Sequence, residues 1–297
     1  MKNVNKDLLF TIRDRIQTAQ SILIITHLRP DGDAIGSLLG LGLALEVIGK
    51  TVQMVSVDGV PVTYRHLSGS DKISKKVEGS FDLFIVVDCA DLDRIGSALK
   101  DFGQPDINID HHITNLNFAT YNLVEPEAAA TAQIIAQCLK TWEIPISVEV
   151  SDALLTGLLA DTIGPRTGNV NGQVLRVAAD LVEVGSNLAY LYRKALLQKS
   201  VNAARYWGRG LVNLKFEDGI VWTALTLADR KAANYPGWDD ADLINLLSYL
   251  NEAEVAIIFI EQPDQMVKVS WRSHNGKDVS QVAMRFGGGG HRAAAGA

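Results

Sequence analysis

The sequence contains little cysteine and no segment that resembles a secretion signal. Of its 297 residues only Cys89 and Cys138 are cysteines, and both have apolar neighbours. Two thiols cannot form the disulfide framework of a small secreted domain or a thiolate zinc site. The first fifteen residues contain six charged side chains, so they lack the uninterrupted apolar core of a signal peptide. These absences predict a protein of the reducing cytoplasm.

Long apolar runs and an excess of basic residues are also missing. The most apolar predicted helix begins at Ala34, contains Glu46 and several glycines, and stays shorter than a membrane span. The net charge is −6 and the isoelectric point lies near 5.5. Binding to long duplex DNA needs many Lys and Arg side chains to displace counterions. The sequence therefore predicts neither a membrane segment nor a long duplex DNA partner.

The charge is unevenly distributed along the chain. Residues 265–297 contain five basic residues and one acidic residue, a net charge of +4. The remainder contains 23 basic and 33 acidic residues, a net charge of −10. A small basic segment beside an acidic body favours a small anionic ligand.

The length and the pattern of apolar runs predict two domains. Up to residue 185, short apolar β-branched runs alternate with helical periodicity, which is typical of an α/β domain with a mostly parallel sheet flanked by helices. Residues 186–205 are predicted to be a helical connector. Residues 206–297 predict a smaller α+β domain with a largely antiparallel sheet, which begins with a hairpin formed by residues 211–216 and 220–225.

The first candidate site lies where a strand passes into a helix. The apolar run at residues 22–26 is followed by His27, Asp31 and Asp33, and then by the helix from Ala34. In a parallel sheet this end of a strand is where ligands bind. One imidazole and two carboxylates suit a divalent metal. The alternative at this point is a polar turn in which Asp33 caps the helix.

Two further strands end in similar residues. The run at residues 82–87 ends in Asp88, and the run at 107–109 ends in Asp110, His111 and His112. A predicted helix ends in Asp161, where a carboxylate opposes the helix dipole unless a cation is bound. The candidate metal ligands are His27, Asp31, Asp33, Asp88, His111 and Asp161.

This ligand set suits two ions rather than one. Four carboxylates in one site repel one another unless cations neutralise them. Six ligands with two imidazoles exceed a single structural zinc site and suit two ions that share a carboxylate. Mixed nitrogen and oxygen ligands favour two Mn²⁺ ions, with Mg²⁺ or Co²⁺ as substitutes.

The basic C-terminal segment contains a second motif. Gly287 to Gly290 precede His291, and Arg272 with Ser273 lies on a predicted strand end. Glycines allow backbone amides to approach a phosphate closely. A flexible tail is the alternative, but the downstream His and Arg and the positive charge favour substrate binding.

These motifs together resemble those of the DHH phosphoesterase superfamily. His27-x-x-x-Asp31-x-Asp33, Asp88, Asp110-His111-His112 and Asp161-Thr162 match its four motifs, and the glycine run matches its small associated domain. The resemblance covers nearly the whole chain and is greatest to the nano-RNase, pAp phosphatase and cyclic-di-AMP phosphodiesterase group. The chain stops at Ala297, where relatives usually continue, which is the pattern expected of a truncated C-terminus.

The resemblance implies a role for each residue. His27, Asp31 and Asp88 would hold one Mn²⁺, and Asp33, Asp88, His111 and Asp161 the other, with Asp88 bridging. His112 would face the scissile phosphate, and Asp110 would orient His111. Arg272, Ser273, Gly288, Gly289, Gly290 and His291 would bind the substrate.

The function implied is hydrolysis of short oligoribonucleotides to 5′-mononucleotides, of pAp (adenosine 3′,5′-bisphosphate) to AMP, or of linear or cyclic dinucleotides. A hydroxide activated by two metals would be the nucleophile, with Asp88 and His112 as the catalytic residues. The alternatives are an inorganic pyrophosphatase of family II and a non-catalytic nucleotide sensor. The sequence leaves a homodimer open.

Overall fold

The computed structural model describes residues 6–99, 103–273 and 276–297. The chain divides into two compact units, Met1–Gln198 and Lys199–Ala297. We call them unit 1 and unit 2 and describe each by itself.

Unit 1 is built on a five-stranded sheet with the order β2-β1-β3-β4-β5, in which every neighbouring pair is parallel. The strands are β1 (Ser21–Ile25), β2 (Thr51–Val55), β3 (Leu83–Val87), β4 (Ile107–Asp110) and β5 (Tyr121–Val124). Because β1, β3 and β4 are neighbours and parallel, their carboxyl ends lie at one edge of the sheet.

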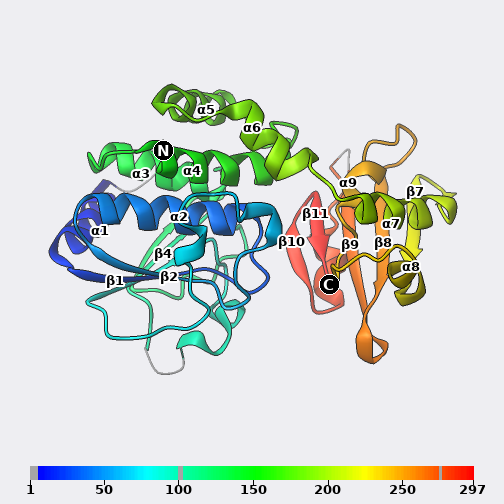
Figure 1. The fold of residues 1–297 in the computed structure, drawn as a ribbon, viewed down its shortest axis with the longest axis horizontal. Helices are drawn as coiled ribbons and strands as arrows, with labels where there is room; N and C mark the ends of the chain where they lie inside the picture. Colours follow the sequence, from blue (N-terminus) through cyan, green and yellow to red (C-terminus); the bar gives the residue numbers. More distant parts are fainter. Residues whose placement is uncertain (1–5, 100–102, 274–275) are drawn as a thin grey trace. The chain divides into compact units, whose positions relative to one another are not determined.

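Both faces of this sheet are buried, which explains the continuous apolar runs in its strands. Ile22 and Ile24 of β1 join the main core with the helices, whereas Leu23 and Ile25 join a second cluster with Phe84. The helices of unit 1 are α1 (Lys6–Thr18), α2 (Gly32–Val47), α3 (Thr131–Thr141), α4 (Val148–Asp161), α5 (Gly172–Val184) and α6 (Leu188–Tyr192). Figure 1 shows α2, α3 and α4 along one face of the sheet, with α5 outside them.

Helices α2 and α4 approach closely because glycines face each other. A Cβ atom on Gly36 would lie 2.5 Å from the carbonyl oxygen of Ala153 and 2.8 Å from the Cα of Gly157. This packing brings the start of α2 close to α4, which ends at Asp161.

Short helical turns connect the other elements of unit 1. They are the 3₁₀ helices η1 (Val62–Tyr64), η2 (Ser70–Lys72) and η3 (Leu92–Leu99), and the π-helical turn η4 (Arg193–Leu197) that continues α6. Leu191 of α6 belongs to the main core of unit 1. The residues predicted as a connector, 186–205, are therefore shared between the two units, since α7 (Val201–Val212) belongs to unit 2.

Unit 2 contains a six-stranded sheet with the order β10-β11-β9-β8-β7-β6. Its strands are β6 (Lys215–Glu217), β7 (Ile220–Leu225), β8 (Val255–Glu261), β9 (Val267–Ser273), β10 (Gly289–His291) and β11 (Ala294–Gly296). All pairings are antiparallel except that of β7 with β8. Helices α8 (Leu227–Ala232), α9 (Leu243–Leu247), α10 (Ser280–Arg285) and the short turn η5 (Pro263–Gln265) complete the unit. The predicted fold class, an α/β domain with a smaller α+β domain, is confirmed.

The predicted hairpin of unit 2 is present, but the predicted start of its first strand is wrong. Residues 211–216 were expected to form a strand, but α7 continues to Val212 and the strand begins at Lys215. Ala203, Tyr206 and Gly210 are buried at intervals of three and four residues, so α7 packs on the core as a helix up to its last turn. Val212 itself is exposed and contributes nothing to a sheet core.

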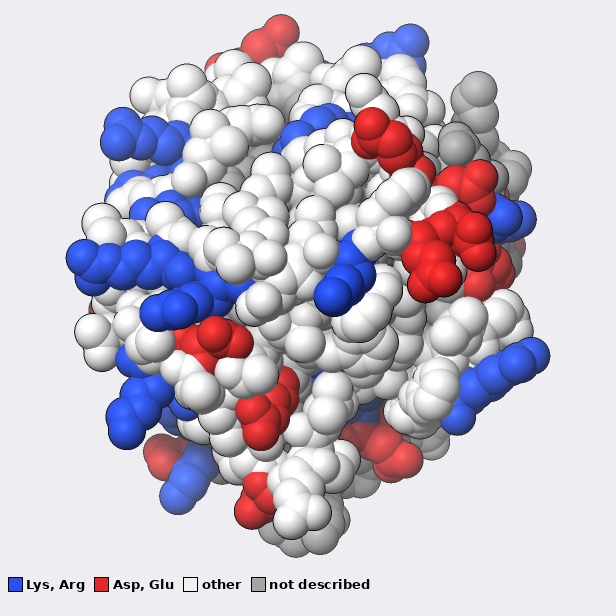
Figure 2. Space-filling view, turned by 90° about the vertical axis from the view of Figure 1, so that its right-hand side faces the viewer, with Lys and Arg blue, Asp and Glu red and all other residues white. Residues whose placement is uncertain are grey.

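The surface carries charges of both signs. On the face in Figure 2, Lys and Arg side chains and Asp and Glu side chains are interspersed, with uncharged surface between many of them. Among the residues that the structure describes, every helix is too short or too polar to cross a membrane.

Candidate metal centre

The candidate site of unit 1 forms where β1, β3 and β4 end. Asp88 follows β3 directly, and Asp110 is the last residue of β4. Asp88 has a φ of +54°, a left-handed conformation that a non-glycine residue rarely adopts. Such strain is retained only where the surroundings enforce it, which is common at functional sites.

Asp31 rather than Asp33 caps the helix that follows β1. Asp31 is the N-cap residue of α2, and its Oδ1 accepts hydrogen bonds from the amides of Asp33 and Ala34, each at 3.0 Å. The interpretation of Asp33 as the cap is wrong, because α2 begins two residues before Ala34, at Gly32. The Asp33 side chain is buried instead, 1% exposed.

The two oxygens of Asp88 face two different imidazoles. Nε2 of His27 lies 3.6 Å from Oδ2 of Asp88, and Nε2 of His111 lies 3.8 Å from Oδ1. His27, Asp31 and Asp88 form one cluster whose ligand atoms lie within 4.8 Å of one another, and Asp33, Asp88 and His111 form another. Asp88 is therefore placed between two potential cation positions.

Asp161 lies beside the second cluster and contacts His111. Its Oδ2 lies 3.1 Å from Nε2 of His111, and Oδ2 of Asp33 lies 3.9 Å from the same nitrogen. The structure thus brings together all six residues that the sequence predicted as metal ligands.

Backbone carbonyls orient both imidazoles. Nδ1 of His27 lies 2.8 Å from the carbonyl oxygen of Leu28, and Nδ1 of His111 lies 3.3 Å from that of Ala128. A carbonyl can only accept, so Nδ1 carries a proton in each ring; in the neutral tautomer the lone pair is then on Nε2, the nitrogen that faces the carboxylates. This tautomer suits coordination through Nε2.

The expected role of Asp110 in orienting His111 is wrong. Oδ1 of Asp110 lies 2.7 Å from Nδ1 of His112, whereas Nδ1 of His111 meets the Ala128 carbonyl. Asn115 donates from Nδ2 to the other oxygen of Asp110 at 2.6 Å. Asp110 is fully buried and fixes His112, the histidine expected to meet the phosphate.

Burial and neighbouring charges shift the pKa values of the buried carboxylates in opposite directions. Burial raises the pKa of Asp33 far above its ordinary value, and the charges of Asp88 and Asp161 raise it further. Burial opposes ionisation of Asp88 too, but the hydrogen bond from His27 and the charges of the three imidazoles hold its pKa well below the ordinary range.

The neighbouring carboxylates favour the protonated form of the imidazoles. Burial lowers the pKa of His27, His111 and His112, but hydrogen bonds to Asp88, Asp161 and Asp110 respectively, with nearby carboxylate charges, raise each of them above 6.5. Divalent cations would replace these protons, because metal ligands must be deprotonated. The donor set of mixed imidazoles and carboxylates fits such cations.

Sequence reasoning missed two residues at this site. Thr131, the first residue of α3, donates from Oγ1 to Oδ1 of Asp88 at 2.9 Å. A guanidinium nitrogen of Arg94 lies 3.3 Å from Nδ1 of His27. No motif marks Thr131. Arg94 stands in η3, shortly after Asp88, so its place near the site could have been inferred.

The predicted substrate-binding residues of unit 2 lie on or next to β9 and β10, the two strands that flank β11. Arg272 and His291 both pair with Ala294, on opposite sides of β11. Nε of Arg272 donates to Oδ1 of Asn245 at 3.2 Å, and Oγ of Ser273 donates to the Lys277 carbonyl at 2.6 Å. Cross-strand partners share a face of a sheet, so Arg272 and His291 lie on one face.

The glycines beside them have different structural demands. A Cβ on Gly288 would lie 2.0 Å from the Gly296 carbonyl oxygen, and one on Gly290 would lie 2.5 Å from that of Ala294. Gly290 also has a φ of +139°. A Cβ on Gly289 would have no heavy atom within 4 Å, so packing does not require a glycine there.

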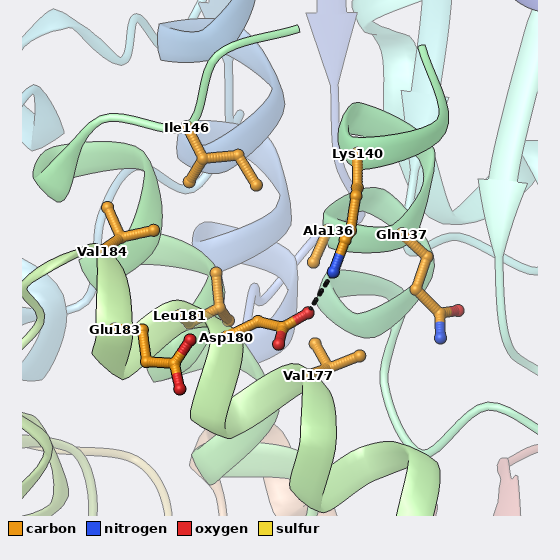
Figure 3. A pocket seen from close by; sticks show the side chains of 9 residues that line it. All are labelled: Ala136, Gln137, Lys140, Ile146, Val177, Asp180, Leu181, Glu183 and Val184. Atoms are coloured by element: carbon orange, nitrogen blue, oxygen red, sulfur yellow. Dashed lines mark hydrogen bonds and ion pairs between the residues drawn. The ribbon is translucent and has the colours of Figure 1, made fainter. Parts of the chain in front are cut away.

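A surface groove of unit 1 lies apart from these residues. It has a volume of about 370 Å³ and lies between α3, α5 and the segment before α4 (Figure 3). An ion pair of 2.7 Å between Lys140 and Asp180 crosses it. None of its lining residues is a predicted site residue, so it is separate from the metal centre.

Two family models match the chain. The model described as the DHH family, N-terminal domain, matches residues 21–158, and that of the DHHA1 domain matches residues 228–297. The second match lies within unit 2 and contains the glycine run.

Curated relatives match over nearly the full length. A bifunctional oligoribonuclease and PAP phosphatase from Thermus thermophilus is 36% identical over 281 residues, which cover 93% of this chain and 83% of that protein. A protein of the same name from Bacillus subtilis is 23% identical, and the match covers 95% of this chain and 90% of that protein.

Solved structures share the fold. The chain has a TM-score of 0.91 to an exopolyphosphatase-related protein from Bacteroides fragilis, with 24% identity, covering 100% of this chain and 92% of that one. It has a TM-score of 0.53 to a putative family II inorganic pyrophosphatase from Methanococcus jannaschii, with 15% identity, covering 84% and 87%.

Proposed function

The chain belongs to the DHH phosphoesterase family, and from that premise we propose that it hydrolyses short oligoribonucleotides and pAp with two divalent cations in unit 1. The observation that carries the proposal is the position of Asp88, whose two oxygens face the Nε2 atoms of His27 and His111. The names of the relatives, which pair oligoribonuclease and PAP phosphatase activity, support the two substrate classes.

In this proposal each cation has its own ligands and shares Asp88. The first would be held by His27, Asp31 and Asp88, and the second by Asp33, Asp88, His111 and Asp161. Mn²⁺ is the proposed ion, with Mg²⁺ or Co²⁺ as substitutes, because imidazole and carboxylate ligands occur together. The cations, when bound, would stabilise charge on the phosphoryl group and activate water.

The residues of the chain then have separate tasks. Asp88 fixes the spacing of the two cation positions. Asp110 keeps the imidazole of His112 oriented through the 2.7 Å contact, so that His112 can hold a phosphoryl oxygen or move a proton. In unit 2, Arg272, Ser273, Gly288, Gly289, Gly290 and His291 would bind the nucleotide.

Location and assembly are part of the same proposal. Both cysteines are unpaired and buried, as expected in the reducing cytoplasm. Short nucleotides rather than long duplex DNA are the proposed partners, since the surface carries both signs of charge (Figure 2). Whether the chain forms a homodimer is tested by its mass in solution.

The test uses metal-stripped protein reconstituted with Mn²⁺. It is incubated with the dinucleotide pApA, with pAp, with cyclic di-AMP and with pyrophosphate, and the products are followed by chromatography. We expect AMP from both pApA and pAp. Asp88→Asn, which keeps the size of the side chain and removes its charge, serves as the control for contaminating enzymes and should retain less than about a tenth of the activity.

Two results would contradict the proposal. Release of phosphate from pyrophosphate alone would indicate a pyrophosphatase. Binding of pApA or pAp without turnover in Mn²⁺ would indicate a nucleotide sensor. Activity on cyclic di-AMP would add that substrate to the first two.

A further inference from the structure

Helix α3 begins without a capping side chain of its own. Its N-cap residue is Ala130, which has an extended backbone and no polar side chain. The amide of Thr131 instead donates to Oδ2 of Asp33 at 2.5 Å, and the amide of Ala132 donates to Oδ1 at 2.9 Å. Asp33, 98 residues earlier in the chain, thus takes the place of a capping residue.

The side chain of Thr131 has a second partner among the proposed ligands. Its Oγ1 donates to Oδ1 of Asp88 at 2.9 Å, and Thr131 is fully buried. One residue therefore donates to carboxylates that follow two different strands, through its amide and through its hydroxyl.

The oxygens that Thr131 contacts are those that face His111. Oδ2 of Asp33 lies 3.9 Å from Nε2 of His111, and Oδ1 of Asp88 lies 3.8 Å from the same nitrogen. The oxygen of Asp88 that faces His27 is Oδ2, which is not the atom that Thr131 contacts. The contacts of Thr131 are thus confined to one side of the shared carboxylate.

From this geometry we propose that Thr131 is a positioning residue that orients Asp33 and Asp88 toward the second cation. The inference rests on the proposed two-cation centre. A carboxylate oxygen has lone pairs for both a hydrogen bond and a cation, so Thr131 fixes the direction of the remaining lone pair without displacing the ion. The backbone amide of residue 131 donates to Asp33 whatever the side chain is. The specific contribution of threonine is therefore the hydroxyl that donates to Asp88.

Thr131→Val tests the hydroxyl, because valine has nearly the same shape and cannot donate. Binding of Mn²⁺ to metal-stripped protein is measured by calorimetry and by electron paramagnetic resonance. We expect the affinity for the second cation to fall about tenfold to a hundredfold, while the affinity for the first changes by less than about threefold. The value of kcat for pApA should fall with little change in KM.

Thr156→Val is the matched control. Thr156 is fully buried in α4 of the same unit, and its hydroxyl has no hydrogen-bond partner among the described residues. Removing that hydroxyl should leave both Mn²⁺ affinities unchanged. Thr131→Ser restores a hydroxyl and should bind both ions within about threefold of the original protein.

The outcomes separate this inference from the proposed function. If the unaltered protein binds two Mn²⁺ ions and Thr131→Val binds both equally well, the role of Thr131 is wrong and the metal centre stands. An equal loss of affinity for the second cation in Thr131→Ser and Thr131→Val would also overturn the positioning role of Thr131. Packing of the side chain, and not hydrogen-bond donation, would then matter. If the unaltered protein binds no Mn²⁺, the metal centre itself is wrong. Should Thr131→Val fail to fold, Thr131→Cys replaces it, because cysteine has a similar size and is a weaker donor. Its affinity for the second cation must then lie between that of the unaltered protein and the value expected for Thr131→Val.

Discussion

Nδ1 of His112 lies 2.7 Å from Oδ1 of Asp110, and this short contact fixes the ring of His112 at the end of β4. The neighbouring His111 is oriented by a backbone carbonyl instead. Two adjacent imidazoles are therefore held by different means, one suited to a metal ligand and one to a charged acid or phosphate contact.

Asp110→Asn should lower kcat while both cations stay bound. The amide cannot accept from both His112 and Asn115, so the ring of His112 loses its fixed orientation and its counter-charge. We expect a loss of about tenfold to a hundredfold in kcat for pApA, with unchanged Mn²⁺ content by atomic absorption. Asp180→Asn, which breaks an exposed ion pair of unit 1, is the control and should change neither quantity. Loss of Mn²⁺ in Asp110→Asn would mean that Asp110 supports the metal centre.

Replacing the two histidines separately should give different losses. His111→Asn removes a proposed ligand of the second cation, so the Mn²⁺ content should fall from two ions to about one per chain. His112→Asn should keep both ions and lower kcat. Metal content and steady-state rates are measured on the same preparations, so that each variant shows whether it loses metal, activity or both. Equal metal loss in both variants would show that the roles are divided wrongly.

The stability of the metal-free protein should depend on pH in a direction set by the site. His27, His111 and His112 have raised pKa values, so they contribute stability below their unfolded pKa, and this is lost as the pH rises through the folded pKa. The raised pKa of Asp33 acts in the same direction. In EDTA, the free energy of unfolding should therefore be lower at about pH 8 than at about pH 6.

Mn²⁺ should reverse this trend, because its ligands bind it only when deprotonated. His66 acts in the opposite direction, because burial lowers its pKa. The variant His111→Asn is therefore the control, since it keeps His66 and lacks one of the imidazoles whose pKa is raised. In EDTA, the free energy of unfolding of His111→Asn should change less between about pH 6 and about pH 8 than that of the unaltered protein. The free energies of unfolding are taken from denaturant titrations at each pH. If they depend on pH equally in the two proteins, the assignment of this pH dependence to His111 is wrong.

Much of the site could be predicted because the chemistry follows the strands. The apolar runs of β1 and β3 are followed by His27 and Asp88, and β4 ends in Asp110, so parallel pairing alone brings these residues to one edge. Asp161 could be expected from its place at a helix end. Each of these predictions depends on local pattern and on one rule of sheet topology.

The features that were missed depend on tertiary contacts. Asp33 accepts from two amides of α3 as well as from the Ser37 hydroxyl of its own helix, and no local pattern indicates the contacts with α3. Thr131 lies in an alanine-rich segment whose composition predicts only a helix. The strand expected at residues 211–216 failed because the buried face of α7 extends to Gly210, so packing outweighed the local apolar pattern.

The glycine run offers a matched pair of substitutions. Gly290→Ala would place a Cβ 2.5 Å from the Ala294 carbonyl at a positive φ, so it should destabilise unit 2 by about 1–3 kcal/mol. Gly289→Ala meets no atom within 4 Å and should keep the stability. If a phosphate approaches this backbone, Gly289→Ala should still lower kcat/KM for pApA. Thermal unfolding and kinetics are compared, and unchanged kinetics in Gly289→Ala would exclude the run from substrate binding.

Arg272→Ala should mainly impair nucleotide substrates. Arg272 and His291 flank Ala294 on one face of the sheet, and the side chain of Arg272 is held by Asn245 and by the Trp271 carbonyl. Loss of a charge-assisted hydrogen bond to a phosphate costs about 1.5–3 kcal/mol, so kcat/KM for pApA should fall about tenfold to more than a hundredfold.

The comparison that tests this is a generic ester, bis-p-nitrophenyl phosphate, which has one phosphate and no nucleotide. Arg272→Ala should cleave it almost as well as the unaltered protein, with unchanged Mn²⁺ content. Asn245→Ala removes one contact that holds the guanidinium, so its loss on pApA should be smaller than that of Arg272→Ala. If both substrates lose activity equally in Arg272→Ala, the arginine supports the fold or the metal centre, and its assignment to substrate binding is wrong.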